Sequence, residues 1–255
     1  MGTVPRILFA YGDQNALYQE CTLGNALADA MVIYTGADMA IINGGMLTGN
    51  LQYGDVTRSD IAQCIAEDCV LAVAEVNAAQ LYALLESSVA HVVIDGGRKY
   101  VPEASEHEAF PHVSGYRVSY DPSAAVGERV ARVTVNNEAI DVTDTETTYT
   151  LVSSVNVFDG EFGAPKIENY TVLNETLYSV FESYIRDGWG DEYMMTEKRV
   201  YAMGVNSAQD NTRHTILIIC GVAAILLVLI PKPWKKYAKI NDEDTKLNNE
   251  SEEIQ

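Results

Sequence analysis

Hydrophobic positions recur every three or four residues in four stretches of this chain, a spacing typical of amphipathic helices with one buried face. In the first stretch the apolar positions include Leu23, Leu27 and Met31, and Gly36 supplies the stop signal. The third stretch begins at Asn77, a residue type that caps helix N-termini. The four predicted helices are Leu23–Thr35, Thr57–Ala66 (capped by Thr57 or Ser59), Asn77–His91 and Leu177–Asp187.

Other stretches are continuously apolar or alternate between apolar and polar positions, which predicts strands. Turn signals separate the later ones, at Asp121-Pro122 and at Asn136-Asn137. A charged stretch over 95–109 is interpreted as a loop, and the overlapping segment HEAFPH (107–112) is also interpreted as a loop. The predicted strands are Arg6–Tyr11, Asp38–Asn43, Val70–Val76, Tyr116–Tyr120, Arg129–Val135 and Thr148–Val157. Helix–strand alternation followed by a β-rich half predicts a mixed α/β fold.

One segment near the C-terminus, 216–230, is apolar on every side, and four lysines follow it within nine residues. We therefore predict a transmembrane helix over 215–231, preceded by a linker at 206–214 and a globular domain at 1–205. The lysine excess places the acidic, disordered tail 232–255 in the cytoplasm and the large domain outside the cell or in a lumen. The expected protein is a single-pass membrane protein.

Two N-glycosylation sequons, at Asn169 and Asn174, would lie on that outer side, whereas a third at Asn249 would lie in the cytoplasmic tail. Residues 1–15 contain no signal peptide, which conflicts with this topology. We expect either that sequence upstream is missing or that the single span directs its own insertion, and we favour the first explanation.

Charge and composition narrow the function classes. The net charge is −19, which argues against nucleic-acid binding because a phosphate-binding surface needs clustered Lys and Arg. The cysteines form no disulfide framework, and a disulfide between Cys64 and Cys69 is as plausible as two free thiols. HEAFPH does not fit a zinc-protease helix, because its two histidines are five residues apart and Pro111 lies between them. Asp29 and Asp38 are interpreted as structural.

The sequence also resembles a known family, the C-terminal substrate-recognition domain of 5'-nucleotidases, and in particular the ecto-5'-nucleotidases. The resemblance covers roughly residues 5–205 and rests on seven segments in the same order. These are ECTLGNALADAM (20–31), TGADMAIINGG (35–45), GDVT (54–57), VNAAQLYALLESSV (76–89), FPHVSGYRVSYDPS (110–123), GERVARVTVN (127–136) and TYTLVSSVNVF (148–158).

The resemblance implies a division of labour. In the family, an N-terminal metallophosphatase domain binds two divalent metal ions and cleaves the phosphate ester, and the C-terminal domain holds the nucleoside between two aromatic rings. This chain carries only the recognition half, so we expect no metal and no catalytic residue in it and no hydrolysis by this chain alone. The implied partners are a nucleoside or nucleotide ligand, the membrane through 215–231, and a metallophosphatase domain.

The glycine stretch carries the substrate-binding residues that the resemblance implies. The family pattern Asn-Gly-Gly-Gly-Ile-Arg falls on Asn43–Thr48, so Asn43, Gly44 and Gly45 would face the ligand. Phe158 would supply one stacking ring if its loop is shifted by two residues. That hypothesis fails if the Phe158 ring is buried in the core.

Four family positions are degenerate in this chain. The two arginines fall on Leu17 and Thr48, which cannot offer forked donors to ribose or phosphate oxygens. The two stacking rings fall on Glu67 and Asn156. These losses favour an alternative function, namely a non-catalytic extracellular or luminal interaction module whose nucleoside cleft is degenerate.

Overall fold

The computed structural model describes residues 2–12, 14–66, 69–95, 98–100, 108–188 and 198–204. Met1–Val205 form one compact unit, and the second unit, Asn206–Gln255, lies outside the described residues. The predicted membrane segment 215–231 and the acidic tail therefore lie outside them as well. Within the described part of the chain, no helix has the length and apolar character needed to cross a bilayer.

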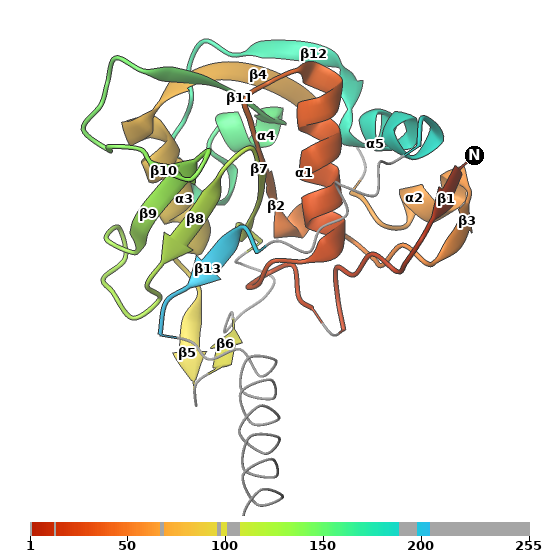
Figure 1. Cartoon of the computed structure of the whole chain (residues 1–255), viewed down its shortest axis with the longest axis horizontal. Helices are drawn as coiled ribbons and strands as arrows, with labels where there is room; N and C mark the ends of the chain where they lie inside the picture. The colour runs from red at the N-terminus through yellow and green to blue at the C-terminus, as the bar shows by residue number, and fades with distance from the viewer. Residues whose placement is uncertain are drawn as a thin grey trace, which may run out of the picture. The chain divides into compact units, whose positions relative to one another are not determined.

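A five-stranded mixed sheet forms the centre of the compact unit (Figure 1). Its order is β12-β4-β11-β2-β7. Only β11 and β2 are parallel, with Leu151 opposite Met39, and the other three pairs are antiparallel. The strands are β2 (Met39–Asn43), β4 (Val70–Asn77), β7 (Pro111–Ser114), β11 (Thr148–Ser154) and β12 (Thr171–Thr176). All five residues of β2 are buried, as expected for a central strand.

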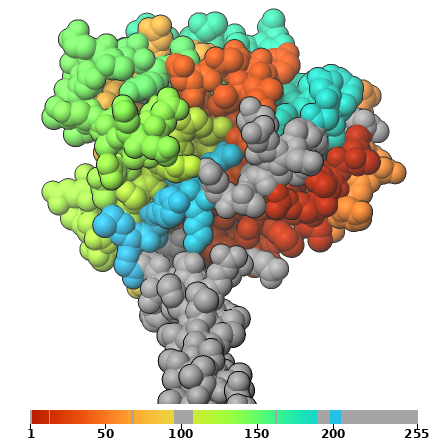
Figure 2. All heavy atoms as spheres, viewed as in Figure 1, coloured from red at the N-terminus to blue at the C-terminus, as the bar shows by residue number. Residues whose placement is uncertain are grey.

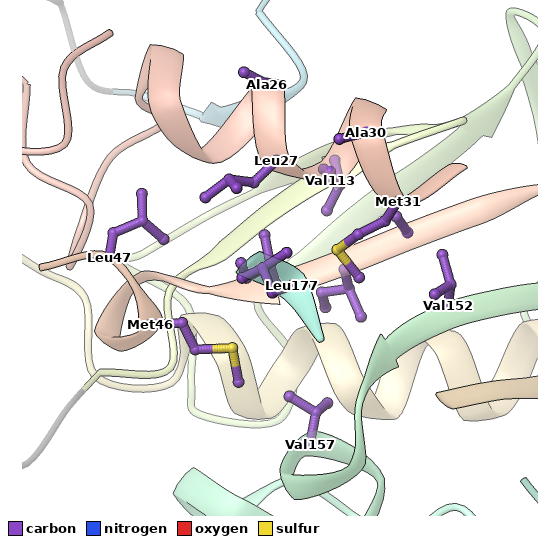
Figure 3. Close-up of a cluster of buried hydrophobic side chains, with 14 of the residues drawn as sticks. Ala26, Leu27, Ala30, Met31, Met46, Leu47, Val113, Val152, Val157 and Leu177 are labelled. Atoms are coloured by element: carbon purple, nitrogen blue, oxygen red, sulfur yellow. The ribbon is translucent and has the colours of Figure 1, made fainter. Parts of the chain in front are cut away.

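Helices α1 (Thr22–Thr35), α3 (Ala78–Val89) and α5 (Leu177–Arg186) confirm the predictions from helical spacing. Gly36 ends α1 in the left-handed conformation, with φ 71°, and Asn77 caps α3. α1 packs against β2, β7, β11 and α5. Its side chains Leu27 and Met31 join the buried cluster that also holds Val157 (Figure 3).

A second sheet of four strands has the order β10-β9-β8-β13. The turn between β9 and β10 confirms the predicted hairpin, because Asn136 and Asn137 both have positive φ (51° and 68°), as a two-residue hairpin turn requires. β13 runs parallel to β8. The strands are β8 (Arg117–Tyr120), β9 (Val130–Val135), β10 (Glu138–Ala139) and β13 (Val200–Ala202).

The remaining elements are short. Two strand pairs lie apart from these sheets, namely β1 (Gly2–Val4) with β3 (Gly54–Val56), and β5 (Val93–Asp95) with β6 (Arg98–Tyr100). The short helices are α2 (Arg58–Ala62), α4 (Val155–Phe158) and the 3-10 turns Gly44–Met46 and Glu161–Gly163.

Several predicted boundaries are wrong because side chains take over the hydrogen bonding of the backbone. The predicted strand Arg6–Tyr11 is irregular apart from one bridge at Leu8. Instead, the amides of Ala10 and Tyr11 both donate to the side chain of Asn50. β11 ends at Ser154, whose hydroxyl caps α4, so the strand does not reach residue 157.

The other corrections concern two loops and a helix end. α2 is capped by Thr57 as predicted, but it ends at Ala62 because the chain after it pairs with the segment following the glycine turn. The charged stretch 95–109 contains β6, and Pro111 and His112 begin β7 instead of lying in a loop. Residues 101–107 lie outside the described residues.

Candidate ligand-recognition site

Two loops leave the five-stranded sheet at the same edge. β2 and β11 are parallel neighbours, and β2 ends at Asn43 while β11 ends at Ser154. The 3-10 turn Gly44–Met46 follows the first strand and α4 follows the second. Ligands in α/β sheets commonly bind outside the carboxyl ends of parallel strands. The fold therefore brings the glycine turn and Asn156 to the same end of the sheet, although Asn43 and Asn156 are 113 residues apart in sequence.

The two glycines of the turn lie against other parts of the chain, Gly44 against the backbone of Ala16 and Gly45 against the side chain of Glu108. The amide of Gly44 donates to the carbonyl of Phe110 at 2.8 Å, and the amide of Gly45 donates to the carbonyl of Glu108 at 2.9 Å. A side chain at Gly44 would fall far inside van der Waals contact with the carbonyl oxygen of Ala16. The glycine spacing thus permits close packing of three chain segments around the turn.

Asn43 is the one polar side chain at the end of β2, and it is 2% exposed. Among the described residues its Oδ1 has no hydrogen-bond partner. A buried acceptor without a partner costs about 1–3 kcal/mol, so such an atom needs an explanation in a native structure. A donor from a ligand is one way to satisfy it.

The segment after the turn pairs with residues 63–66. The amide of Ala66 donates to the carbonyl of Met46 at 2.8 Å, and the amide of Thr48 donates to the carbonyl of Cys64 at 2.9 Å. The exposed Thr48 also uses its hydroxyl, which donates to the carbonyl of Gln63. Glu67 lies outside the described residues, but its neighbour Ala66 is held at this site.

Leu17 also reaches the site. Its amide nitrogen is 3.3 Å from the position that a Cβ at Gly44 would take, and its side chain is partly buried. The structure therefore gathers the family positions 17, 43–48 and the approach to 67. Leu17 and Thr48, the two positions at which the resemblance implies a family arginine, carry no charge.

Phe158, the residue predicted to supply a stacking ring, is placed differently from the positions above. The Phe158 ring is 0% exposed and lies 5.5 Å from the Tyr170 ring, centroid to centroid. In this structure it offers no face to a base, so the stacking role inferred for Phe158 fails by its own criterion. Asn156, two residues earlier, is exposed on α4.

Met46 is the position at which the resemblance implies a third glycine, and its side chain is 5% exposed. Figure 3 shows Met46 directed toward the same buried cluster as Val157, the third residue of α4. The extra side chain therefore fills core volume between the glycine turn and α4. This packing accompanies the buried position of Phe158.

Sequence reasoning missed a buried Cys–His contact beneath the glycine turn. Both ring nitrogens of His112 are 3.8 Å from the Cys21 thiol, and Nε2 is 3.1 Å from the carbonyl of Ala16. Burial lowers the pKa of His112 to about 4 and raises that of Cys21 to about 12. Both groups are therefore neutral at pH 7, so the contact lacks the thiolate–imidazolium character of a nucleophilic pair. Cys21 and His112 lie in the segments ECTLGN and FPHVSG, and nothing in either segment indicates that the two side chains meet.

The two aspartates interpreted as structural have structural partners. Asp29 accepts hydrogen bonds from Arg199 and from Ser114. Asp38 accepts from the amide and the hydroxyl of Thr150.

Thiols and metal-ligand clusters complete the description of the compact unit. Cys64 and Cys69 are separate thiols, so the first of the two alternatives, a disulfide, is not formed. Within the described ranges no group of three or more His, Cys, Asp or Glu side chains is placed to hold a metal ion.

Comparisons with known proteins agree with this fold. The chain spans only a small part of its curated relatives. It is 27% identical to the trifunctional nucleotide phosphoesterase protein YfkN of Bacillus subtilis over 171 residues, which are 66% of this chain and 11% of the relative. It is 25% identical to a 5'-nucleotidase-related protein of Glossina morsitans morsitans over 170 residues, 60% of this chain and 29% of the relative.

Solved structures share the fold. A 5'-nucleotidase precursor from Thermus thermophilus superposes with a TM-score of 0.65 at 21% identity, covering 80% of this chain and 39% of that one. A 5'-nucleotidase from Staphylococcus aureus, described as putative, gives 0.62 at 15% identity, covering 79% and 39%. The family described as 5'-nucleotidase, C-terminal domain, matches residues 1–169, about two thirds of the sequence. This chain belongs to that family.

Proposed function

We propose that this chain is the ligand-recognition part of a 5'-nucleotidase-like protein and takes part in nucleotide hydrolysis only with a metallophosphatase domain. In this proposal the phosphatase domain supplies both divalent metal ions and the cleavage of the phosphate ester. The chain described here binds the nucleoside end of the substrate and performs no chemistry alone. The segment 215–231 anchors it in a membrane, with residues 1–205 outside the cell or in a lumen and 232–255 in the cytoplasm.

The observation that carries the proposal is that the parallel strands β2 and β11 end side by side at the same end of the sheet. This arrangement puts Asn43, the glycine turn and Asn156 at one place in the fold, beside Leu17 and Thr48. Asn43 adds a buried Oδ1 without a partner among the described residues. A nucleoside presents amino and hydroxyl donors, either of which can satisfy such an oxygen.

A second candidate is a non-catalytic interaction module with a degenerate cleft. Two specific observations favour it. The Phe158 ring is buried, and the Thr48 hydroxyl is engaged by the carbonyl of Gln63, so neither group is free to bind a nucleotide. Genomic sequence upstream of Met1 separates the candidates, because an encoded metallophosphatase domain supports the first and a stop codon or promoter supports the second.

Calorimetric titration of the full chain in detergent micelles with adenosine and AMP tests the first candidate. We expect micromolar binding that does not change with zinc, because this chain holds no metal in the proposal. Absence of heat at millimolar ligand would refute recognition and leave the interaction module.

Two variants locate the site. Asn43→Ala removes the unpaired oxygen and is expected to weaken adenosine binding about tenfold, since one hydrogen bond contributes about 1–1.5 kcal/mol. The control Gln52→Ala removes an exposed amide just before β3 and should change nothing. Thr48→Arg restores a forked donor and should strengthen AMP binding relative to adenosine, because only AMP carries a phosphate.

A further inference from the structure

The two edges of the five-stranded sheet are protected in different ways. At one edge, β7 begins with Pro111, which has no amide hydrogen to offer another strand. Arg199 also donates to the carbonyl of Val113 in this strand at 2.9 Å. Proline and a covering side chain are standard defences of an edge strand against pairing with another chain.

The opposite edge is β12, which has neither defence. Its sequence, TVLNET, contains no proline, lysine or arginine. Among the described residues no strand pairs with its outer side, and Figure 1 shows it at the rim of the sheet. Its pairing with β4 is irregular between Val172 and Thr176, and that irregularity, together with Glu175, is the protein's own partial defence.

Three side chains of β12 are exposed, those of Thr171, Val172 and Asn174. Val172 is 54% exposed and Asn174 is also exposed, whereas Leu173 and Glu175 between and after them are partly buried. Val172 and Asn174 are therefore both exposed to solvent along this edge. Figure 2 shows atoms of this region at the outer rim of the molecule. An edge strand that has no partner among the described residues and carries an exposed valine favours edge-to-edge association.

Both sequons of the large domain overlap this edge strand. Asn169 is exposed, has φ 63° and lies two residues before β12, and its sequon threonine, Thr171, is the first residue of the strand. Asn174 lies within the strand and its sequon threonine, Thr176, is the last residue. The family match ends at residue 169, so β12 lies after the matched residues.

We propose that N-linked glycans on Asn169 and Asn174 cover the open edge of β12 and prevent it from pairing with a second copy of this chain. The proposal rests on the topology stated under the proposed function. The donor is an oligosaccharide on a lipid diphosphate. The Asn amide nitrogen forms a bond to the anomeric carbon, the bond from that carbon to the diphosphate oxygen breaks, and the amide loses one proton.

Thr176 limits the choice of variants, since its hydroxyl accepts a hydrogen bond from the Ser179 amide and caps α5. Replacing it would disturb the helix as well as the sequon. Asn169→Gln and Asn174→Gln remove the acceptor amides and leave that cap intact. Asn249→Gln is the matched control, because its sequon lies in the tail that the topology places in the cytoplasm.

The first experiment expresses the full chain in a eukaryotic cell and measures peptide masses before and after enzymatic removal of N-glycans. We expect glycans on Asn169 and Asn174, loss of one glycan in each single variant, and no change in Asn249→Gln. Protease protection of intact microsomes reports the topology separately. Unmodified asparagines in a protected domain would overturn this inference alone, and an unprotected domain would overturn the proposed topology and this inference together.

The second experiment measures mass by light scattering in detergent. The double variant Asn169→Gln/Asn174→Gln should shift toward larger species than the glycosylated protein. Adding Val172→Lys to the double variant should reverse that shift, because a charge on the edge opposes strand pairing. An unchanged mass on glycan loss would overturn the shielding role. Association that Val172→Lys fails to reverse would place the contact elsewhere and overturn it equally.

Discussion

Arg199 joins the end of the described chain to its first long helix through a bidentate ion pair with Asp29. Nη1 and Nη2 of Arg199 lie 2.7 and 2.9 Å from the two carboxylate oxygens, and the Asp29 side chain is 3% exposed. Glu20 accepts from the Arg199 amide as well, at 2.9 Å. β13 is therefore fastened to α1 at the point where the chain continues toward the predicted membrane segment.

Removing one partner of this pair is expected to be costly. Arg199→Ala leaves the Asp29 carboxylate buried without its counter-charge, and we expect a loss of about 3 kcal/mol in the free energy of unfolding. Urea denaturation of the full chain measures it. Arg199→Lys should recover only part of the loss, because an ammonium group cannot make the forked contact. The control Arg186→Ala breaks an exposed pair with Asp187 and should cost under about 1 kcal/mol.

His112 predicts a dependence of stability on pH. Burial holds its pKa at about 4 in the folded state, against 6.5 for the free side chain. At a pH between these two pKa values, His112 is protonated in the unfolded chain and neutral in the folded protein. The His112 contribution is therefore complete above pH 6.5 and is lost progressively down to about pH 4, about 3 kcal/mol in all.

Urea denaturation at pH 7.5, 6 and 5 tests this dependence. His112→Gln keeps an N–H donor for the Ala16 carbonyl but does not titrate, so its stability should fall less steeply as the pH drops. Carboxylates contribute equally to both proteins and cancel in the difference. Parallel curves for the two proteins would show that His112 does not titrate on unfolding.

We expect the buried thiols of Cys21 and Cys64 to be alkylated slowly in the folded protein. Burial raises the pKa of Cys21 to about 12 and that of Cys64 to about 11, with a further contribution from Asp60 at Cys64. The thiolate is the reactive form, so alkylation by iodoacetamide at pH 8 should be at least about a hundredfold slower in the folded protein than in urea. Peptide mass spectrometry quantifies both sites. Rapid native labelling of Cys21 would contradict its place beneath the glycine turn.

We expect a single added methyl group at Gly44 to lower the free energy of unfolding strongly. Ala at this position would collide with the Ala16 carbonyl, a backbone atom that cannot move without shifting its whole segment. We expect Gly44→Ala to cost at least about 3 kcal/mol of unfolding free energy, by urea denaturation. Gly12→Ala is the comparison. It faces open space but has φ 98°, so only the backbone penalty of about 1 kcal/mol applies. Equal losses would mean that the turn relaxes.

Local signals in the sequence located the regular elements well. Helical spacing and the caps at Gly36 and Asn77 predicted α1 and α3, and Asn136-Asn137 predicted a hairpin, because these features depend on neighbours a few residues apart. Boundaries failed where a distant side chain intervened. Asn50 binds the backbone near Tyr11, and nothing in the sequence around residue 11 indicates it.

The sequence by itself determined the mixed α/β class, the family and the positions proposed for ligand recognition. The tertiary structure decided which of those positions lie together and which side chains are buried. The glycine spacing predicts that another part of the chain packs closely against the turn, but it does not identify that part, which here is the carbonyl of Ala16. An aromatic side chain has the same chemistry in a core and in a binding wall, so only the packing of α4 could place Phe158 inside. Long-range contacts, which local patterns do not encode, made both decisions.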